Sequence, residues 1–189
     1  MQSQSLIGGF SDAPKDSAIA FRVALDVMAR PGKIAKISGG TPPEPMSTSA
    51  GTLLLTLCDP ETPVWLAPSL RGAQIKEWLR FHTGAPLVDS RSEAMFAVGR
   101  WSELLPVTDF AIGTPEYPDR SATLIVEVEA LENAGAILHG PGIKDTSELA
   151  LPEVKAFRNN ATLFPLGLDF YFTSGSRIAA LPRTTKLEG

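Results

Sequence analysis

The stretch FPLGLDFYFTSGSRIAALPRTT, which runs from Phe164 to Thr185, decides the fold of this chain. Two apolar runs flank the polar turn Ser174–Ser176, whose central glycine favours a tight reversal. We therefore expect two strands paired in a buried hairpin. The first run is apolar on both faces except for Asp169, and the second ends just before Arg183. A buried hairpin that carries one acid and one arginine is unusual, so both side chains become candidate functional residues.

The composition is that of an ordinary globular protein. The chain has 189 residues, 20% of them charged, and a formal net charge of −4. We expect a single domain over residues 1–189, with a core from about residue 10 to residue 185. The sequence has no basic run, which argues against a nucleic-acid partner. Its longest apolar run is far shorter than the 18 or so residues of a membrane span, which argues against a membrane contact.

Two further features bear on location. The segment Met1–Ser5 has neither the basic region nor the hydrophobic run of a signal peptide, so we expect a cytoplasmic protein. The single cysteine, Cys58, excludes an intramolecular disulfide and fits a reducing compartment. It follows a leucine-rich run, and this setting favours an inert core thiol over a nucleophile.

Helices are expected mainly in the first half, over residues 14–30, 49–58 and 72–82, with another over 151–160. In the first of these, Phe21, Leu25 and Met28 follow the i, i+4, i+7 spacing that predicts a core-facing stripe. Pro31 and Gly32 end that helix, because proline cannot continue it and glycine permits a positive φ.

Strands dominate the second half. Besides the closing hairpin, we expect strands over residues 33–38, 64–66, 87–88, 95–99 and 123–128. In the last of these, Leu124, Val126 and Val128 alternate with Ile125 and Glu127, which is the period of a strand. The pattern predicts an α/β fold, a three-layer α/β/α sandwich built on a mixed sheet.

The sequence lacks the familiar patterns for metals, phosphates and nucleophiles. Its two histidines, His82 and His139, and its one cysteine show no metal-ligand spacing, so we expect no metal site. Gly140-Pro141-Gly142 comes nearest to a phosphate loop, but its proline removes an N–H group and a simple turn is favoured. No Gly-x-Ser-x-Gly motif occurs. Loop-like or polar contexts hold Lys33, Lys36, Lys76, Lys144, Lys155 and Lys186, which argues against a pyridoxal-phosphate Schiff base.

What remains is a set of charged side chains in apolar settings, none of which the sequence identifies as catalytic. Structural ion pairs are the favoured interpretation, followed by subunit contacts and then by recognition of phosphate or phosphonate, whose oxygens suit the guanidinium fork. For His82, a core or helix-end role is favoured over that of a catalytic base. His82 and Arg80 nevertheless lie where both could face an anion or a partner. The candidates for anion binding or a subunit interface are Arg22, Arg30, Arg80, His82, Asp169 and Arg183, with Asp59 as a further acid.

Several ordered motifs, together with the closing cassette, make the chain resemble a known family. None is diagnostic alone, but their order and spacing over about residues 10–185 closely resemble the PhnH family, which supplies a subunit of the bacterial carbon–phosphorus lyase system for phosphonate breakdown. The motifs are Phe21-Arg22, Met28–Gly32, Thr62–Leu66, Leu79–Val88, Ala94–Val98, Ser121–Ile125 and Gly140–Ile143.

The resemblance implies a fold similar to the large domain of pyridoxal-phosphate-dependent transferases, a likeness that does not imply the cofactor. It also implies a subunit of the carbon–phosphorus lyase core complex. In that family the G, H, I and L subunits together transfer the ribose triphosphate of ATP to a phosphonate, which gives α-D-ribose 1-methylphosphonate 5-triphosphate and adenine. A separate radical subunit cleaves the carbon–phosphorus bond with an iron–sulfur cluster, which a single cysteine cannot hold.

The resemblance further implies the other lyase subunits as partners, a homodimer when the chain is alone, and no cofactor bound by this chain, with ATP as a substrate of the complex. Two alternatives remain open. One is a stand-alone phosphonate- or nucleotide-binding homodimer that uses the arginines named above. The other is a homodimeric structural protein unrelated to phosphonates.

Overall fold

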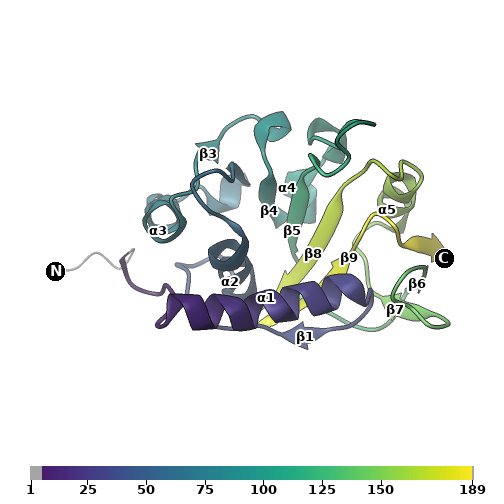
Figure 1. Ribbon diagram of the computed structural model, residues 1–189, viewed down its shortest axis with the longest axis horizontal. Helices are drawn as coiled ribbons and strands as arrows, with labels where there is room; N and C mark the ends of the chain where they lie inside the picture. The colour runs from purple at the N-terminus through teal and green to yellow at the C-terminus, as the bar shows by residue number, and fades with distance from the viewer. Residues whose placement is uncertain (1–5, 189) are drawn as a thin grey trace.

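The computed structural model describes residues 6–188, so the segment Met1–Ser5, on which the expected location depends, lies outside the described residues. Helices and strands alternate through the first half of the chain, and strands predominate after it (Figure 1). The elements are α1 (Ala13–Ala29), β1 (Ala35–Lys36), α2 (Thr48–Leu57), β2 (Val64–Leu66), η2 (Pro68–Leu70), α3 (Ala73–Thr83), β3 (Leu87–Val88), η3 (Arg91–Glu93), β4 (Phe96–Arg100), α4 (Trp101–Leu104), η4 (Val107–Asp109), β5 (Thr123–Glu127), β6 (Ala136–His139), β7 (Ser147–Leu149), α5 (Val154–Ala161), β8 (Asp169–Ser174), β9 (Arg177–Leu181) and β10 (Lys186–Glu188).

A seven-stranded mixed sheet forms the centre of the protein, in the order β1-β9-β8-β5-β4-β2-β3. From β8 to β3 each strand pairs in parallel with its neighbour, whereas β9 pairs antiparallel with both β8 and β1. The expected closing hairpin is confirmed, with Phe170 opposite Leu181. Its first strand begins only at Asp169, because the chain turns through residues 163–167 and Gly167 adopts a φ of 117°, which favours glycine.

Different elements pack against the two faces of this sheet. On β5, Ile125 belongs to a core packed under α1, α2 and α3, whereas Leu124 and Val126 belong to a core that includes Phe157 of α5. The alternation read from the sequence is therefore confirmed. The second core also includes Leu138 from a three-stranded sheet of order β10-β6-β7. The protein is therefore an α/β structure in which helices accompany a seven-stranded mixed sheet. The three-layer sandwich and the likeness to pyridoxal-phosphate transferases stay predictions.

Helix α1 buries a different stripe from the one expected. Its buried residues are Ala20, Ala24 and Val27, whereas Phe21 is 49% exposed and Leu25 is 55% exposed. The expectation of a core-facing stripe that contained these two side chains was wrong. The helix packs against α2 and β9, and small alanine side chains allow the close approach that this packing needs.

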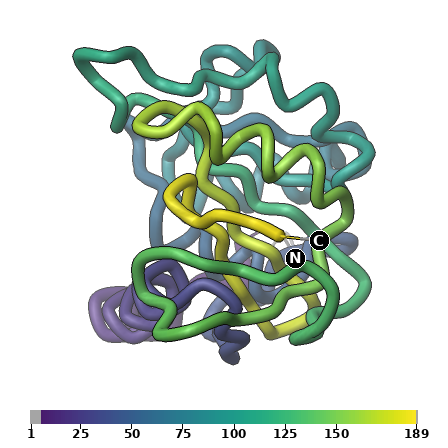
Figure 2. Tube along the Cα trace, turned by 90° about the vertical axis from the view of Figure 1, so that its right-hand side faces the viewer, coloured from purple at the N-terminus to yellow at the C-terminus, as the bar shows by residue number. Residues whose placement is uncertain are grey.

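The Gly140–Gly142 turn follows β6 and lies beside the end of α1 (Figure 2). A Cβ atom on Gly142, whose φ is 80°, would lie 1.9 Å from the Ala29 carbonyl oxygen, so only glycine fits there. In the same region the Asn133 side-chain amide donates to the Gly32 and Glu148 carbonyl groups. The sequence-based interpretation of a structural turn is therefore confirmed.

Candidate functional site

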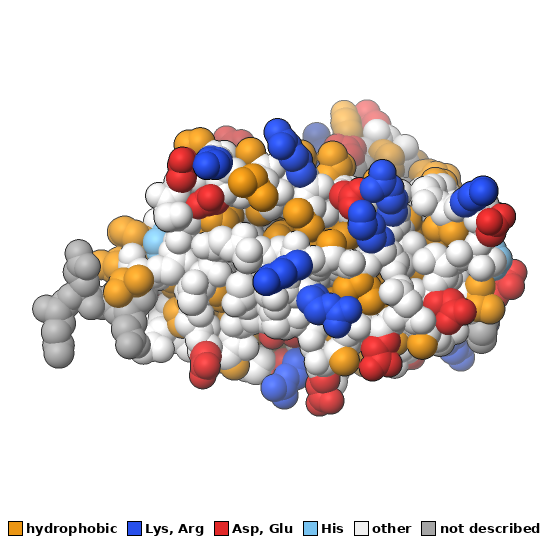
Figure 3. Space-filling view, turned by 90° about the horizontal axis from the view of Figure 1, so that it is seen from below, with side chains coloured by type: hydrophobic (Ala, Val, Ile, Leu, Met, Phe, Trp, Pro, Cys, Tyr) orange, Lys and Arg blue, Asp and Glu red, His pale blue; other side chains and the backbone are white. Residues whose placement is uncertain are grey.

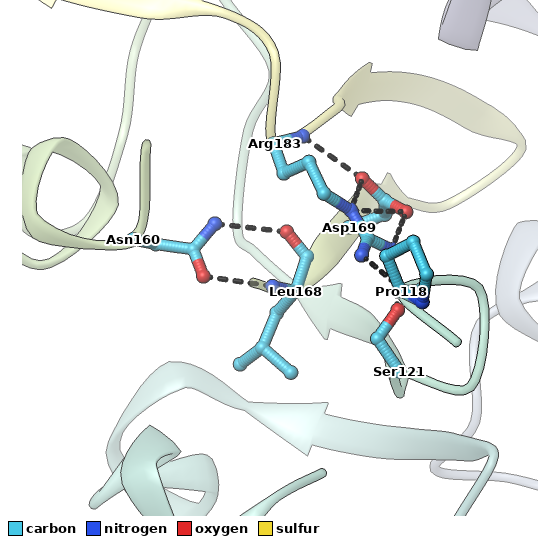
Figure 4. Close-up of polar contacts among 6 residues, drawn as sticks. All are labelled: Pro118, Ser121, Asn160, Leu168, Asp169 and Arg183. Atoms are coloured by element: carbon cyan, nitrogen blue, oxygen red, sulfur yellow. Dashed lines mark hydrogen bonds and ion pairs between the residues drawn. The ribbon is translucent and has the colours of Figure 1, made fainter. Parts of the chain in front are cut away.

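Asp169 and Arg183 form an ion pair that ties the closing hairpin to its surroundings (Figure 4). Asp169 begins β8, and Arg183 follows the end of β9. The Arg183 backbone N–H donates to Asp169 Oδ1 at 2.8 Å, and its Nε donates to both carboxylate oxygens at 3.2 Å. The side chains are 24% and 12% exposed, respectively. The pair is thus largely shielded from solvent, so loss of either partner would leave a poorly solvated charge.

The same guanidinium reaches a loop far away in the sequence. Arg183 Nη1 donates to the Pro118 carbonyl oxygen at 2.8 Å, and Nη2 donates to the Ser121 hydroxyl and to Asp169. All three guanidinium nitrogens therefore already donate to the protein itself. This geometry supports the interpretation of a structural ion pair. A role of Asp169 or Arg183 in anion binding or at an interface stays a prediction.

A buried amide supports the hairpin from the other side. The Asn160 side chain, 8% exposed, donates to the Leu168 carbonyl oxygen and accepts from the Leu168 N–H, both at 2.8 Å. The amide thereby pairs with the backbone as a neighbouring strand would. Sequence reasoning missed this residue, because an asparagine near the end of a helix looks like a solvent-exposed polar residue.

Cys58 is buried at the end of α2, as expected for an inert thiol. Burial raises its pKa to about 12, with a smaller contribution from the neighbouring Asp59. The thiolate is therefore scarce at neutral pH, which argues against a nucleophile. Asp59 itself accepts from the Thr62 hydroxyl and the Glu61 N–H, and these bonds lower its pKa and fix the turn after the helix.

Arg80 and His82, which the sequence placed where they could face an anion or a partner, line different cavities. His82 lies against the start of α1, in a depression lined by Phe10, Pro14 and Leu55 among others. Its ring centroid lies 5.3 Å from that of Trp78, and burial lowers its pKa. Within the described residues, its buried Nε2 has no hydrogen-bond partner. The aromatic and apolar surroundings support the interpretation of a core or helix-end histidine.

Arg80 instead lines a small cavity of about 120 Å³ beside β2 and β3. Arg71 and Lys76 line it too, together with the carboxyl ends of both strands at Leu66 and Val88. This is the edge at which open parallel sheets bind ligands. Sequence reasoning named neither Arg71 nor Lys76 as a site residue, although Lys76 and Arg80 show the i, i+4 spacing of one helix face.

The remaining two candidates lie on α1. Arg30, at the end of the helix, pairs with Asp26, which also accepts from Lys33 at 2.6 Å. The hydrogen bond from Lys33 is the main cause that lowers the pKa of Asp26. Arg22 is exposed, and helical spacing places it between Ile19 and Leu25.

Exposed apolar side chains surround Arg22. Ile19, Phe21 and Leu25 are 50%, 49% and 55% exposed, and we call these three with Arg22 the α1 surface. Over the face seen from below, hydrophobic side chains are interspersed with both basic and acidic ones, so no large field of one sign forms there (Figure 3). An apolar helix face with one central arginine has the composition of a protein–protein contact.

A metal-binding cluster and a membrane-spanning helix are both absent from residues 6–188. No group of three or more His, Cys, Asp or Glu side chains in this part of the chain is arranged to hold a metal ion. No helix in the same part is both long and apolar enough to cross a membrane.

The fold and these features define a mixed α/β protein with a basic cavity at its parallel strand ends and an exposed apolar helix. Comparison with known sequences then gives its family. The sequence model described as "Bacterial phosphonate metabolism protein (PhnH)" matches residues 8–188. The chain belongs to the PhnH family.

Two relatives match over most of their lengths. One, from Rhizobium meliloti (strain 1021), is named "Alpha-D-ribose 1-methylphosphonate 5-triphosphate synthase subunit PhnH"; the chain is 44% identical to it over 195 residues, which cover 99% of this chain and 98% of the relative. The other, from Stutzerimonas stutzeri, is named "Putative C-P lyase subunit protein HtxG". It is 28% identical over 181 residues, which cover 93% of this chain and 87% of the relative.

Proposed function

We propose that this chain is a subunit of the carbon–phosphorus lyase core complex in phosphonate catabolism. Together with its partner subunits it supports transfer of the ribose triphosphate of ATP to methylphosphonate, with release of adenine. The observation that carries the proposal is the 44% identity to a named synthase subunit over almost the full length of both chains. The complex is a transferase that acts in the cytoplasm, and ATP is its substrate.

The α1 surface is the contact with a partner subunit in this proposal. Three large apolar side chains that are about half exposed lose most of their remaining contact with water when a partner covers them, which favours association. Without the other subunits, a second copy of the chain covers the same surface, giving a homodimer. Arg22 supplies a charged group at the centre, where arginine is common in interface hot spots.

The fold likeness to pyridoxal-phosphate transferases extends, in this proposal, to a three-layer architecture but not to the cofactor. A pyridoxal-phosphate lysine must be neutral to form its Schiff base, and burial is the usual means of lowering its pKa. No lysine within residues 6–188 is buried. We therefore expect the chain to bind no pyridoxal phosphate.

Co-expression tests the proposal. The tagged chain is produced with the G, I and J subunits of its own genome, and the purified material is analysed by size exclusion and mass measurement. A stable hetero-oligomer that contains this chain is expected. Recovery of a lone homodimer while the other subunits are soluble would contradict the proposal.

One alternative is favoured by a specific observation. The basic cavity beside β2 and β3 fits a stand-alone phosphonate- or nucleotide-binding homodimer as well as it fits a subunit. The co-expression experiment separates the two, since only a subunit forms the hetero-oligomer.

A further inference from the structure

We propose that the cavity lined by Arg71, Lys76 and Arg80 binds one phosphate or phosphonate group. Three positively charged residues and one carboxylate, that of Asp89, line it. The Asp89 side chain is fully solvent-exposed, with a relative exposure of 101%, and its Oδ1 lies 3.6 Å from Arg71 Nη1, so it offsets part of one positive charge. With three positive groups against one negative group, the lining keeps a net positive charge, and an anion is the ligand that it favours.

The three basic groups differ in how they are held. Arg71 Nε donates to the Leu66 carbonyl oxygen at 2.8 Å, and its guanidinium carbon lies 5.4 Å from the centroid of the Trp65 ring. Trp65 Nε1 in turn donates to the Asp89 carbonyl oxygen at 3.2 Å. One arginine is therefore fixed in place before any ligand arrives. Its Nη1 forms an ion pair with Asp89 Oδ1 at 3.6 Å, and its Nη2 keeps its donors for an oxyanion.

The Lys76 ammonium and the Arg80 guanidinium have no hydrogen bond or ion pair to another described residue. They lie at i and i+4 on α3, a spacing at which like charges repel and destabilise the helix. A bound anion converts this repulsion into two charge-assisted contacts. Both side-chain charges are therefore available to an anion in the cavity.

The size of the cavity limits the ligand. A volume of about 120 Å³ suits a single tetrahedral group, whereas sites for whole drug-sized or nucleotide ligands occupy several hundred Å³. A larger cavity at the ends of β4 and β5, about 630 Å³, is lined by Arg100 but also by Glu127 and Glu129, so its lining does not favour an anion. The small cavity is therefore the better oxyanion site.

The choice of ligand rests on the proposed function, whereas the chemistry of the cavity does not depend on it. Two groups in the proposed reaction share the required chemistry: the phosphonate that receives the ribose, and the triphosphate of the nucleotide. Both are tetrahedral oxyanions that the arginine fork and the lysine can bind.

Titration calorimetry of the full chain with inorganic phosphate, methylphosphonate and tripolyphosphate tests the proposal. We compare wild type with the double variant Lys76→Gln/Arg80→Gln. The matched control is Lys36→Gln/Arg177→Gln, which removes the same two charges at exposed positions of β1 and β9. The charge-retaining variant Lys76→Arg/Arg80→Lys checks that the charges matter rather than the side-chain shapes alone.

We expect saturable binding by wild type, the matched control and the charge-retaining variant, and at least about tenfold weaker binding by Lys76→Gln/Arg80→Gln. Tighter binding of methylphosphonate would assign the site to the phosphonate, and tighter binding of tripolyphosphate would assign it to the nucleotide. Absence of saturable binding by wild type, alone and in the co-purified complex, would overturn the proposal. Equal weakening in both double-glutamine variants would overturn it too, because it would show only a general effect of charge.

Co-purification with the other lyase subunits is read in parallel. A wild-type chain that assembles but binds no anion would overturn the site and leave the proposed function standing. A chain that binds phosphate at these residues but does not assemble would contradict the proposed function and leave the site standing.

Discussion

Removal of the Arg183 guanidinium should destabilise the protein strongly. In the variant Arg183→Met, Asp169 keeps the backbone N–H of residue 183 but loses every donor from the side chain. The Pro118 carbonyl and the Ser121 hydroxyl lose their partner as well. The change therefore leaves a shielded carboxylate without its counter-charge and releases a loop from the hairpin.

The expected loss can be estimated from these contacts. Removing one member of a fully buried ion pair costs about 3–5 kcal/mol, and an exposed pair is worth about 0–1 kcal/mol. The two side chains are 24% and 12% exposed, which places this pair nearer the buried limit. We expect the free energy of unfolding to fall by about 2–4 kcal/mol.

Urea unfolding at neutral pH measures this loss. The control is Arg177→Met, which makes the same replacement at an exposed position of the same hairpin and should change the free energy of unfolding by less than about 0.5 kcal/mol. A double-mutant cycle that adds Asp169→Ala then isolates the energy of the pair. Equal stability of Arg183→Met and Arg177→Met would refute the reasoning.

Three further changes test other parts of the account. Phe21→Glu should abolish co-purification with partner subunits without lowering the thermal midpoint, because it places a charge on the α1 surface, which is exposed in the free chain. Asn160→Ala should lower the free energy of unfolding by about 2–4 kcal/mol in urea titrations, since both Leu168 backbone groups lose their partner. Burial raises the pKa of Cys58 from 9.0 to about 12. Between pH 9 and 12 the free energy of unfolding of the wild type should therefore fall as the pH rises, with a slope that is steeper than that of Cys58→Ala by about 1.4 kcal/mol per pH unit.

Each of these predictions has a control or a contradicting result. Met95→Glu replaces a side chain that is 50% exposed, much like Phe21, and should leave assembly intact. A loss of less than about 0.5 kcal/mol in Asn160→Ala would show that water replaces the amide without cost. The sign for Cys58 follows from proton release: the unfolded thiol ionises above pH 9 while the folded thiol stays protonated, so stability must fall as the pH rises. Parallel pH curves for wild type and Cys58→Ala would contradict the raised pKa.

Local patterns predicted much of the fold because they carry the physics of single elements. The closing hairpin and the alternation in β5 depend on a period of two and on a glycine turn, and both can be read from neighbouring residues. The stripe of α1 could not be read in this way. Its large side chains suggested the core, but close packing on α2 and β9 selected the alanines instead.

The candidate site was predicted only in part, since cavities depend on tertiary contacts. Arg80 was named from the sequence, and Lys76 lies one helical turn before it, whereas Arg71 and the strand ends join them only because the chain leaves β2 and returns as β3. Asp169 and Arg183 were named as well, whereas their link to Ser121 spans 62 positions in the sequence. No local pattern predicts such a contact.

Reconstitution of the synthase reaction tests the central claim most directly. The partner subunits are incubated with ATP and methylphosphonate, with and without this chain, and adenine release is measured. The account predicts that adenine and the ribose methylphosphonate triphosphate form at a substantial rate only when this chain is present. An equal rate in its absence would contradict the claim that the chain is a working subunit of the synthase.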